Sequence, residues 1–187
     1  WWHVWQVKRY AVESLLADYA FDQKIDFKPD NQLLRWPGRG NPYFESFYGF
    51  ALPNQDLAPF VDIDNDGKYD PYKGDYPVAD PNYKSKIADD LCWYVFNYSK
   101  CLGKANCDIN VEIQATSYSF YVPNKYAVNL SIYTDYKLIN KSNISSDSFY
   151  VSIYSDIDID CRFDDFGGCS PGKNAYYGYN SVEMTSG

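Results

Sequence analysis

The chain is poor in several residue types that catalysis and nucleic-acid binding require. Its 187 residues contain a single histidine, His3, and acidic residues outnumber basic ones by 25 to 17, for a formal net charge of −8. Binding of nucleic acid requires positive charge, so this balance argues against a nucleic-acid partner. The sequence has no nucleophile elbow, Walker loop or dinucleotide fingerprint, and one histidine leaves few groups to transfer protons near neutral pH. These absences favour a protein that is not an enzyme.

Long apolar runs are also missing. No stretch approaches the roughly 20 apolar residues of a membrane-spanning helix, so we expect no direct membrane insertion. The chain begins at Trp1 with no initiator methionine or signal peptide, and we interpret it as a mature or excised piece of a longer protein. Aromatic residues are abundant at 19%, and 45% of the residues are hydrophobic, which predicts a folded domain with a sizeable core.

The 5 cysteines include no C-x-x-C spacing of a structural zinc site. Two pairs are close in sequence, and we predict the disulfides Cys101–Cys107 and Cys161–Cys169, with Cys92 free and buried. The alternative, that all are reduced and buried, stays open. Turn-rich segments around four of the cysteines favour bridges and therefore an oxidising compartment.

Hydrophobic periodicity predicts a mainly β fold. Within residues 1–22, apolar side chains recur at three- and four-residue steps: Val4, Val7, Ala11, Leu15 and Tyr19. This spacing predicts one amphipathic helix that ends before Pro29. The second half predicts antiparallel strands over 111–122, 127–140 and 148–158, each with alternating character and separated by turns. We therefore expect an antiparallel β-sandwich-like domain with an N-terminal helix. Residues 1–60 would form the helix and an irregular lead-in, and 61–187 the calcium-loop and β domain.

The most specific pattern is the acidic stretch 61–77, VDIDNDGKYDPYKGDYP. Aspartates at alternate positions, with Gly67 at the sharp turn, match the first half of a calcium-binding loop. Oxygen-only ligands favour Ca²⁺ over zinc or copper. Position 12 of the loop is Lys73, where an EF-hand has a glutamate ligand. Asp75 would then complete the coordination shell of the ion. The predicted ligands are Asp62, Asp64, Asp66, the backbone carbonyl of Lys68, Asp70 and Asp75; the alternative is a solvated acidic turn.

A weaker acidic cluster follows the third predicted strand. It lacks the glycine of the template, and it could be a second metal site made of Asp156, Asp158, Asp160, Asp164 and Asp165. The alternative is an acidic strand end held by Arg162 and the predicted Cys161–Cys169 loop.

The order of these motifs resembles a group of secreted surface proteins of Bacteroidota. The resemblance rests on WPGRGNPYF, LAPFVDIDNDGKYDPYKGDYP, WYVFN, VEIQATSYSF, YKLINKS, SDIDI and DDFGGCSPGKNAYYGYN. Such proteins are long chains usually exported by the type IX secretion route, with a C-terminal sorting domain. The resemblance implies an extracellular or cell-surface location and a role in adhesion or surface assembly. The chain departs from the group at Asp160, where glycine is expected, and at Tyr98, where aspartate is expected.

The sequence therefore predicts a non-catalytic, calcium-stabilised module of a bacterial surface or filament assembly. Its partners would be other copies or other surface proteins. A carbohydrate-binding module is one alternative, because such modules stack sugars on exposed aromatic rings, and part of a secreted hydrolase is another, because paired carboxylates can hydrolyse glycosides. The candidate aromatic contact surface comprises Trp1, Trp2, Tyr176, Tyr177 and Tyr179. Trp5, Trp36 and Trp93 are expected to pack in the core.

Overall fold

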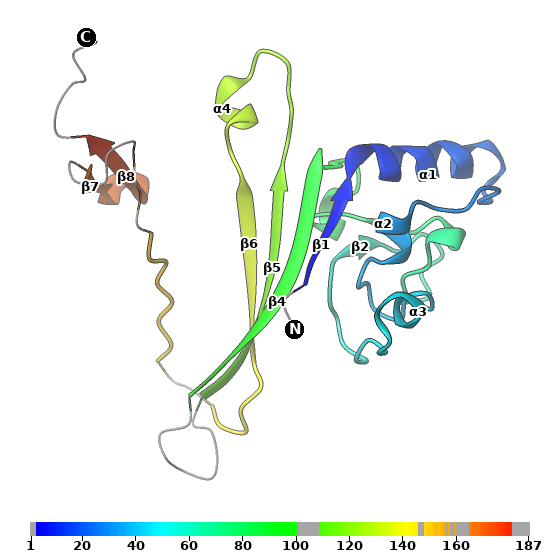
Figure 1. Ribbon diagram of the computed structural model, residues 1–187, viewed down its shortest axis with the longest axis horizontal. Helices are drawn as coiled ribbons and strands as arrows, with labels where there is room; N and C mark the ends of the chain where they lie inside the picture. Colours follow the sequence, from blue (N-terminus) through cyan, green and yellow to red (C-terminus); the bar gives the residue numbers. More distant parts are fainter. Residues whose placement is uncertain are drawn as a thin grey trace. The chain divides into compact units, whose positions relative to one another are not determined.

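The computed structural model describes residues 3–100, 109–145, 148–155, 157, 159 and 165–180. The chain divides into two compact units, Trp1–Ile144 and Ser145–Gly187. The expected irregular lead-in and the acidic loop both lie in the first unit. Within the described residues the protein is mainly antiparallel β, with one four-stranded sheet and two two-stranded sheets (Figure 1).

The first unit contains most of the regular structure. Its strands are β1 (Val4–Lys8), β2 (Phe60–Val61), β3 (Tyr76–Pro77), β4 (Asp90–Lys100), β5 (Ile109–Ser119) and β6 (Tyr133–Asn140). Its helices are α1 (Arg9–Asp22), α2 (Asn31–Leu34), α3 (Phe44–Tyr48) and α4 (Tyr126–Asn129), with 3₁₀ turns η1 (Pro71–Lys73) and η2 (Pro81–Tyr83). None of the described helices is long and apolar enough to cross a membrane.

The N-terminal segment begins as a strand and continues as a helix. The predicted helix exists from Arg9 to Asp22 and buries Ala11, Val12 and Leu15. Residues 4–8, expected to be helical, instead form β1, which pairs antiparallel with β4. Valine and tryptophan favour extended backbone, and the ladder with β4 buries Val7 at 1% exposure, so tertiary pairing overrides the helical spacing.

The four-stranded sheet has the order β1-β4-β5-β6, with antiparallel neighbours throughout. The prediction of a strand at 111–122 is confirmed by β5. The strand predicted at 127–140 is too long, because α4 occupies residues 126–129 and β6 begins at Tyr133. The described residues 148–155 form no strand, contrary to the prediction. Conversely, the sequence patterns did not predict β4, although it has partners on both sides.

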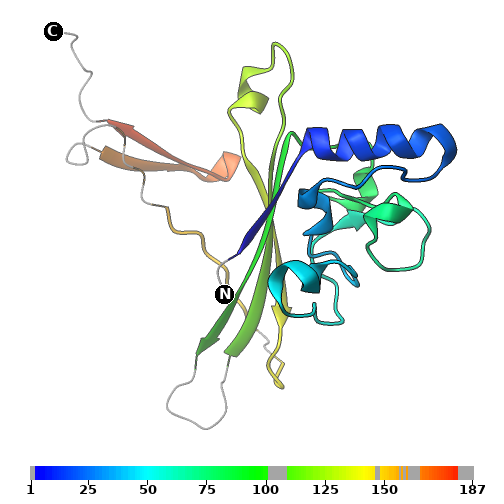
Figure 2. The same ribbon diagram turned by 45° about the vertical axis from the view of Figure 1, so that its right-hand side comes forward.

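One face of this sheet carries the core. Helices α1, α2 and α3 and the β2–β3 ribbon lie together beside β1, whereas β6 is at the other edge of the sheet (Figures 1 and 2). Trp93 of β4 is 2% exposed and Trp36 is 0% exposed, which confirms their predicted packing role. The Trp36 indole N–H donates to the carbonyl of Pro59 at 3.1 Å. The layer over this face consists of helices, loops and the short β2–β3 ribbon, and no larger second sheet of a sandwich covers it within the described residues.

The described residues of the second unit form one hairpin. Strand β7 (Asp165–Ser170) pairs antiparallel with β8 (Ala175–Asn180) through the 3₁₀ turn η3 (Pro171–Lys173). Asn174, at φ 48°, closes the turn in the left-handed conformation that asparagine tolerates.

Candidate metal centre

The acidic loop is held at its base by a short antiparallel ribbon. Strand β2 pairs with β3, with Val61 opposite Tyr76 and Phe60 opposite Pro77. Asp62 directly follows β2 and Asp75 directly precedes β3, so the ribbon brings together two carboxylates thirteen residues apart in the sequence. The sheet-like pairing, and not the loop sequence alone, creates this closeness.

Three of the predicted ligands converge. One carboxylate oxygen from each of Asp62, Asp64 and Asp75 lies within 4.8 Å of the others. Asp75 is fully buried, and Oδ1 of Asp62 is buried with no hydrogen-bond partner among the described residues. A buried, unpaired carboxylate oxygen is costly unless a cation or donor satisfies it. The arrangement therefore has the donor set and the unsatisfied acceptor that a hard cation would complete.

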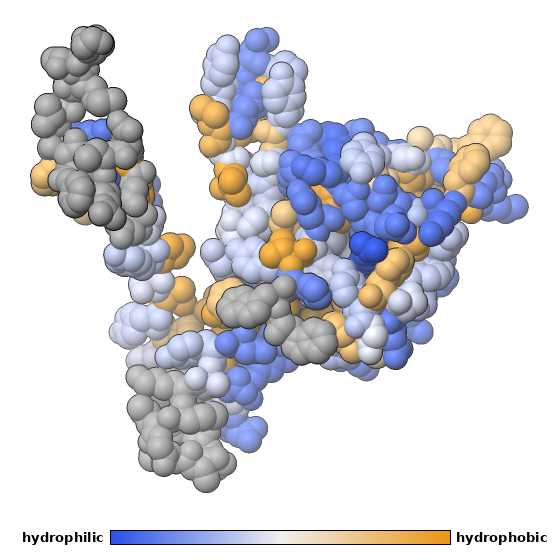
Figure 3. Space-filling model, in the orientation of Figure 1, coloured by the Kyte–Doolittle hydropathy of each residue, from blue (hydrophilic) through white to orange (hydrophobic). Residues whose placement is uncertain are grey.

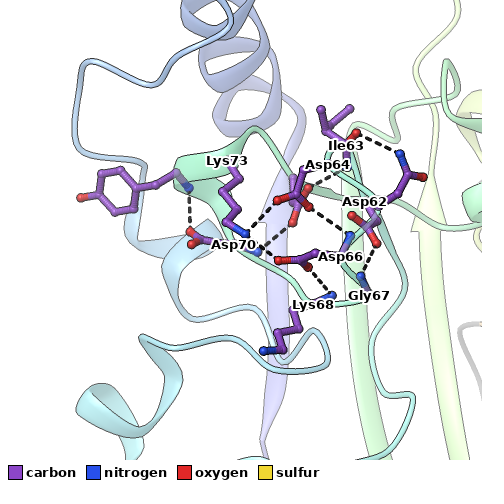
Figure 4. A network of polar contacts seen from close by, with 11 residues as sticks. Asp62, Ile63, Asp64, Asp66, Gly67, Lys68, Asp70 and Lys73 are labelled. Carbon is purple, nitrogen blue, oxygen red and sulfur yellow. Dashed lines mark hydrogen bonds and ion pairs between the residues drawn. The ribbon is translucent and has the colours of Figure 1, made fainter.

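Local hydrogen bonds curl the loop around this group, as Figure 4 shows. Oδ2 of Asp62 accepts the backbone N–H of Gly67 at 2.8 Å, and Oδ1 of Asp66 accepts that of Lys68 at 2.8 Å. Oδ1 of Asp64 accepts the Asp66 N–H at 3.3 Å. Gly67 has φ 76°, the left-handed region expected for a sharp turn. Each of these aspartates thus fixes backbone with one oxygen, and the second oxygen of Asp62 has no hydrogen-bond partner among the described residues.

Lys73 enters the loop as an internal cation. Its Nζ lies 2.8 Å from Oδ2 of Asp64 and 2.5 Å from Oδ2 of Asp66. The hydrogen bond from Lys73 holds the pKa of both carboxyls below their usual value, and the two carboxylates hold the pKa of Lys73 above its own. The sequence showed Lys73 only as a missing ligand. Its positive charge two residues before Asp75 was the signal for this role.

Asp75 is the buried carboxyl of the loop. Burial raises the pKa of Asp75 to about 6, and the charges of Asp62 and Asp64 act in the same direction. Backbone N–H groups of Ile63 and Asp70, each 2.8 Å from the carboxylate, oppose the rise. A bound cation would favour the charged form of this buried carboxyl.

The other three predicted ligands have other partners. The Asp70 side chain accepts the N–H of Tyr72 at 3.0 Å and caps η1, and it is not one of the three converging carboxylates. Lys68 contributes its N–H to Asp66, while the use of its carbonyl as a ligand stays a prediction. Asp66 faces the Lys73 ammonium. The converging group is thus smaller than the six-residue set predicted from the sequence.

The second acidic cluster is described only at Asp165. Asp156, Asp158, Asp160 and Asp164 lie outside the described residues. Both carboxylate oxygens of Asp165 lie 3.1 Å from the backbone N–H of Ile159, so this side chain contributes to the backbone structure of the second unit. The second metal site stays a prediction.

The cysteines give a similarly partial picture. Cys92 is a free, half-buried thiol, and Cys169, the predicted partner of Cys161, is exposed. Cys101, Cys107 and Cys161 lie outside the described residues, so both predicted pairings remain untested.

The aromatic surface extends beyond the predicted set. Trp1 and Trp2 lie outside the described residues, while Tyr176, Tyr177 and Tyr179 are about half exposed on β8. The open face of the four-stranded sheet adds a group that sequence reasoning missed: Phe96, Tyr98, Tyr136 and Leu138, between 39% and 51% exposed. The alternation YVFNY at residues 94–98 was the available signal. Figure 3 shows orange apolar groups at several separate places on the visible face, among polar ones.

A cavity of about 520 Å³ in the first unit is lined by Gly67 of the acidic loop and by residues of β4, β5 and β6. Polar and aromatic side chains share its lining, including Arg39, Asp56, Trp93, Gln114 and Lys137. Because Trp93 is only 2% exposed, its ring offers no open platform for a sugar to stack on. No family model, curated protein or solved structure matches the chain.

Proposed function

We propose that this chain is a non-catalytic, calcium-stabilised extracellular module of a bacterial surface or filament assembly. The observation that carries the proposal is the convergence of Asp62, Asp64 and Asp75 within 4.8 Å at the base of the acidic loop. Calcium prefers oxygen ligands in flexible geometry, and backbone carbonyls and water complete its shell in many protein sites. In this role the ion joins the two ends of the loop and lowers the cost of the buried Asp75 charge.

Lys73 gives the metal-free loop a substitute for the ion. Its ammonium partly neutralises Asp64 and Asp66, and calcium binding requires this group to move or to share those carboxylates. A compact ammonium supplies one positive charge where Ca²⁺ supplies two, so the ion offsets carboxylate repulsion more completely. The loop would therefore stay folded without metal and become more stable when calcium is present.

The assembly role is supported by exposed aromatic surface. Tyrosine and phenylalanine are enriched in protein contacts, and the open sheet face and β8 both present them in the described residues. The resemblance to secreted surface proteins of Bacteroidota supports the same role and the extracellular location. The sandwich-like architecture belongs to this proposal too: a second sheet packed on the open face would complete it.

Two alternatives receive less support. A carbohydrate-binding module needs an exposed aromatic platform beside a groove, and the cavity that contains Trp93 buries that ring. A secreted hydrolase needs a pair of carboxylates around a substrate, whereas the converging aspartates here are held by backbone N–H groups within their own loop.

Thermal unfolding of the purified chain with calcium and with chelator tests the metal site. At free calcium tenfold above Kd, binding stabilises the folded state by about 1.4 kcal/mol, which raises Tm by a few degrees. Asp64→Ala should remove most of that difference, and Asp26→Ala, an exposed aspartate outside the loop, should keep it. Equal melting with calcium and with chelator in the wild-type protein would exclude a stabilising calcium site.

A further inference from the structure

The strand β6 has a free hydrogen-bonding edge. It occupies the end of the order β1-β4-β5-β6, and among the described residues β5 is its only strand partner. The N–H of Lys141 donates to the carbonyl of Asn110 at 2.8 Å, in register with the β5–β6 ladder. In an antiparallel ladder hydrogen-bonded pairs alternate, so odd-numbered residues of β6 bond to β5. The backbone groups of Thr134, Tyr136 and Leu138 therefore point outward.

A side-chain contact agrees with this assignment. Thr134 is opposite Ser117, and their hydroxyl oxygens lie 2.9 Å apart, as expected for a non-hydrogen-bonded pair, in which side chains are closer. An edge that exposes alternate N–H and C=O groups can accept another strand. Proline, which would block such pairing, is absent from β6, whose sequence is YTDYKLIN.

We propose that β6 pairs antiparallel with β6 of a second copy, around a two-fold axis at Tyr136. In this register Tyr136 is opposite its own symmetry mate, and Thr134 is opposite Leu138 of the other copy. All of these are residues with outward backbone groups, so the hydrogen-bonding pattern is satisfied. The two four-stranded sheets become one continuous sheet.

Charge complementarity selects the second copy as the occupant. In the proposed register Asp135 of each copy lies opposite Lys137 of the other, so the dimer contains two identical ion pairs. Both residues fall at non-hydrogen-bonded positions of the new ladder, where opposing Cα atoms are about 4.5 Å apart and side chains interact most closely. An isologous contact requires this self-complementarity, in which residue i meets j and j meets i.

The same charges exclude neighbouring registers. Residues with outward backbone groups must stay opposite one another in any register. The nearest alternative registers therefore have the two-fold axis one residue to either side of Tyr136 along β6. Placing the axis at Asp135 opposes two aspartates, and placing it at Lys137 opposes two lysines. Like charges directly opposite one another destabilise a strand pair. The sequence of the edge thus specifies one pairing, whereas an unspecific edge would tolerate slippage.

Pairing would also enlarge the apolar face of the sheet. Tyr136 and Leu138 lie on the open face, at 48% and 39% exposure, and the two-fold axis brings Tyr136 beside its mate and Leu138 beside Thr134 of the other copy. Larger continuous apolar surface is characteristic of interaction sites. The inference deepens the proposed assembly role, but its geometry requires neither calcium nor an extracellular setting.

The test is the oligomeric state of the full 187-residue chain, measured by sedimentation over a range of protein concentrations, with calcium and with chelator. The wild type should form a dimer in both. Asp135→Lys and Lys137→Asp should each weaken the dimer, raising its Kd by about ten- to a hundredfold, because every ion pair becomes a like-charge pair. The double variant D135K/K137D should dimerise again.

Mixing the two single variants gives the sharpest result. Copies with Asp135→Lys carry lysine at both positions and copies with Lys137→Asp carry aspartate at both, so the mixture should form a heterodimer although neither variant self-associates. Lys125→Asp makes the same charge change outside β6 and should leave the dimer intact. Circular dichroism checks that each variant folds. If Asp135→Lys does not fold, Lys137→Asp alone still tests the proposal. A monomeric wild type, or a dimer that persists in both single variants, would overturn the proposal.

Discussion

At the scale of single residues, Lys73 gives the acidic loop a cation of its own. Its ammonium contacts Asp64, one of the three converging carboxylates, and Asp66, a predicted ligand outside that group. Replacing it with glutamine should strengthen calcium binding, because the ion no longer competes with a positive charge. Because the ammonium repels the divalent ion, we expect its removal to lower the Kd for calcium severalfold. Calorimetric titration of Lys73→Gln measures this change.

Lys24→Gln provides the matched control, since it removes one exposed positive charge outside the loop. It should leave calcium affinity near that of the wild type. Metal-free Lys73→Gln should in turn melt at a lower temperature than the metal-free wild type, because Asp64 and Asp66 lose their partner. An unchanged Kd in Lys73→Gln would show that the ammonium does not occupy the ion's position.

At the scale of elements, Asp89 connects the helix α1 to the sheet. Its carboxylate accepts two hydrogen bonds of 2.9 Å from the Arg9 guanidinium, and a further one of 2.5 Å from the Tyr121 N–H. Partial burial opposes ionisation, but the hydrogen bonds from Arg9 and Tyr121 outweigh it and hold the pKa of Asp89 below its usual value. The charged form is therefore favoured in the folded state.

This shift predicts how stability depends on pH. A carboxyl with a lowered pKa in the folded state contributes stability above its unfolded pKa of about 3.9, and that contribution is lost as pH falls through the lower folded value. Asp89→Asn should lower the free energy of unfolding by about 1–2 kcal/mol at neutral pH, since these side chains are about one-third exposed. Urea unfolding of both proteins should show the difference vanishing in strong acid; a pH-independent difference would contradict the ionic role.

At the scale of the whole molecule, the chain consists of two units whose connecting residues are accessible. Tyr150 and Tyr154, just beyond the end of the first unit, are 91% and 87% exposed, whereas Tyr69 and Trp36 are fully buried. Limited chymotrypsin digestion should therefore cut first after Tyr150 or Tyr154. The remaining fragment should keep the calcium response and the circular dichroism of unit one. First cleavage inside residues 3–100 would contradict this division.

Local chemistry was readable from the sequence. The curl of the acidic loop, the left-handed Gly67 and the helix over residues 9–22 depend on neighbours within a few positions, so spacing alone predicted them. Strand β5 was predicted for the same reason, because its apolar and β-branched residues alternate over its length. The expectation that Trp36 and Trp93 pack in the core also followed from their size and apolar character.

The remaining features were decided by contacts between distant residues. Residues 4–8 are extended because β4 pairs with them, and no local pattern contains that partner. Asp75 is buried with a raised pKa because the β2–β3 ribbon closes the loop over it, and Lys73 faces Asp64 and Asp66 for the same reason. The sequence determined which charges are present along the chain. Tertiary structure decided which of them meet, because the energy of a charge depends on burial and distance, and folding alone sets both.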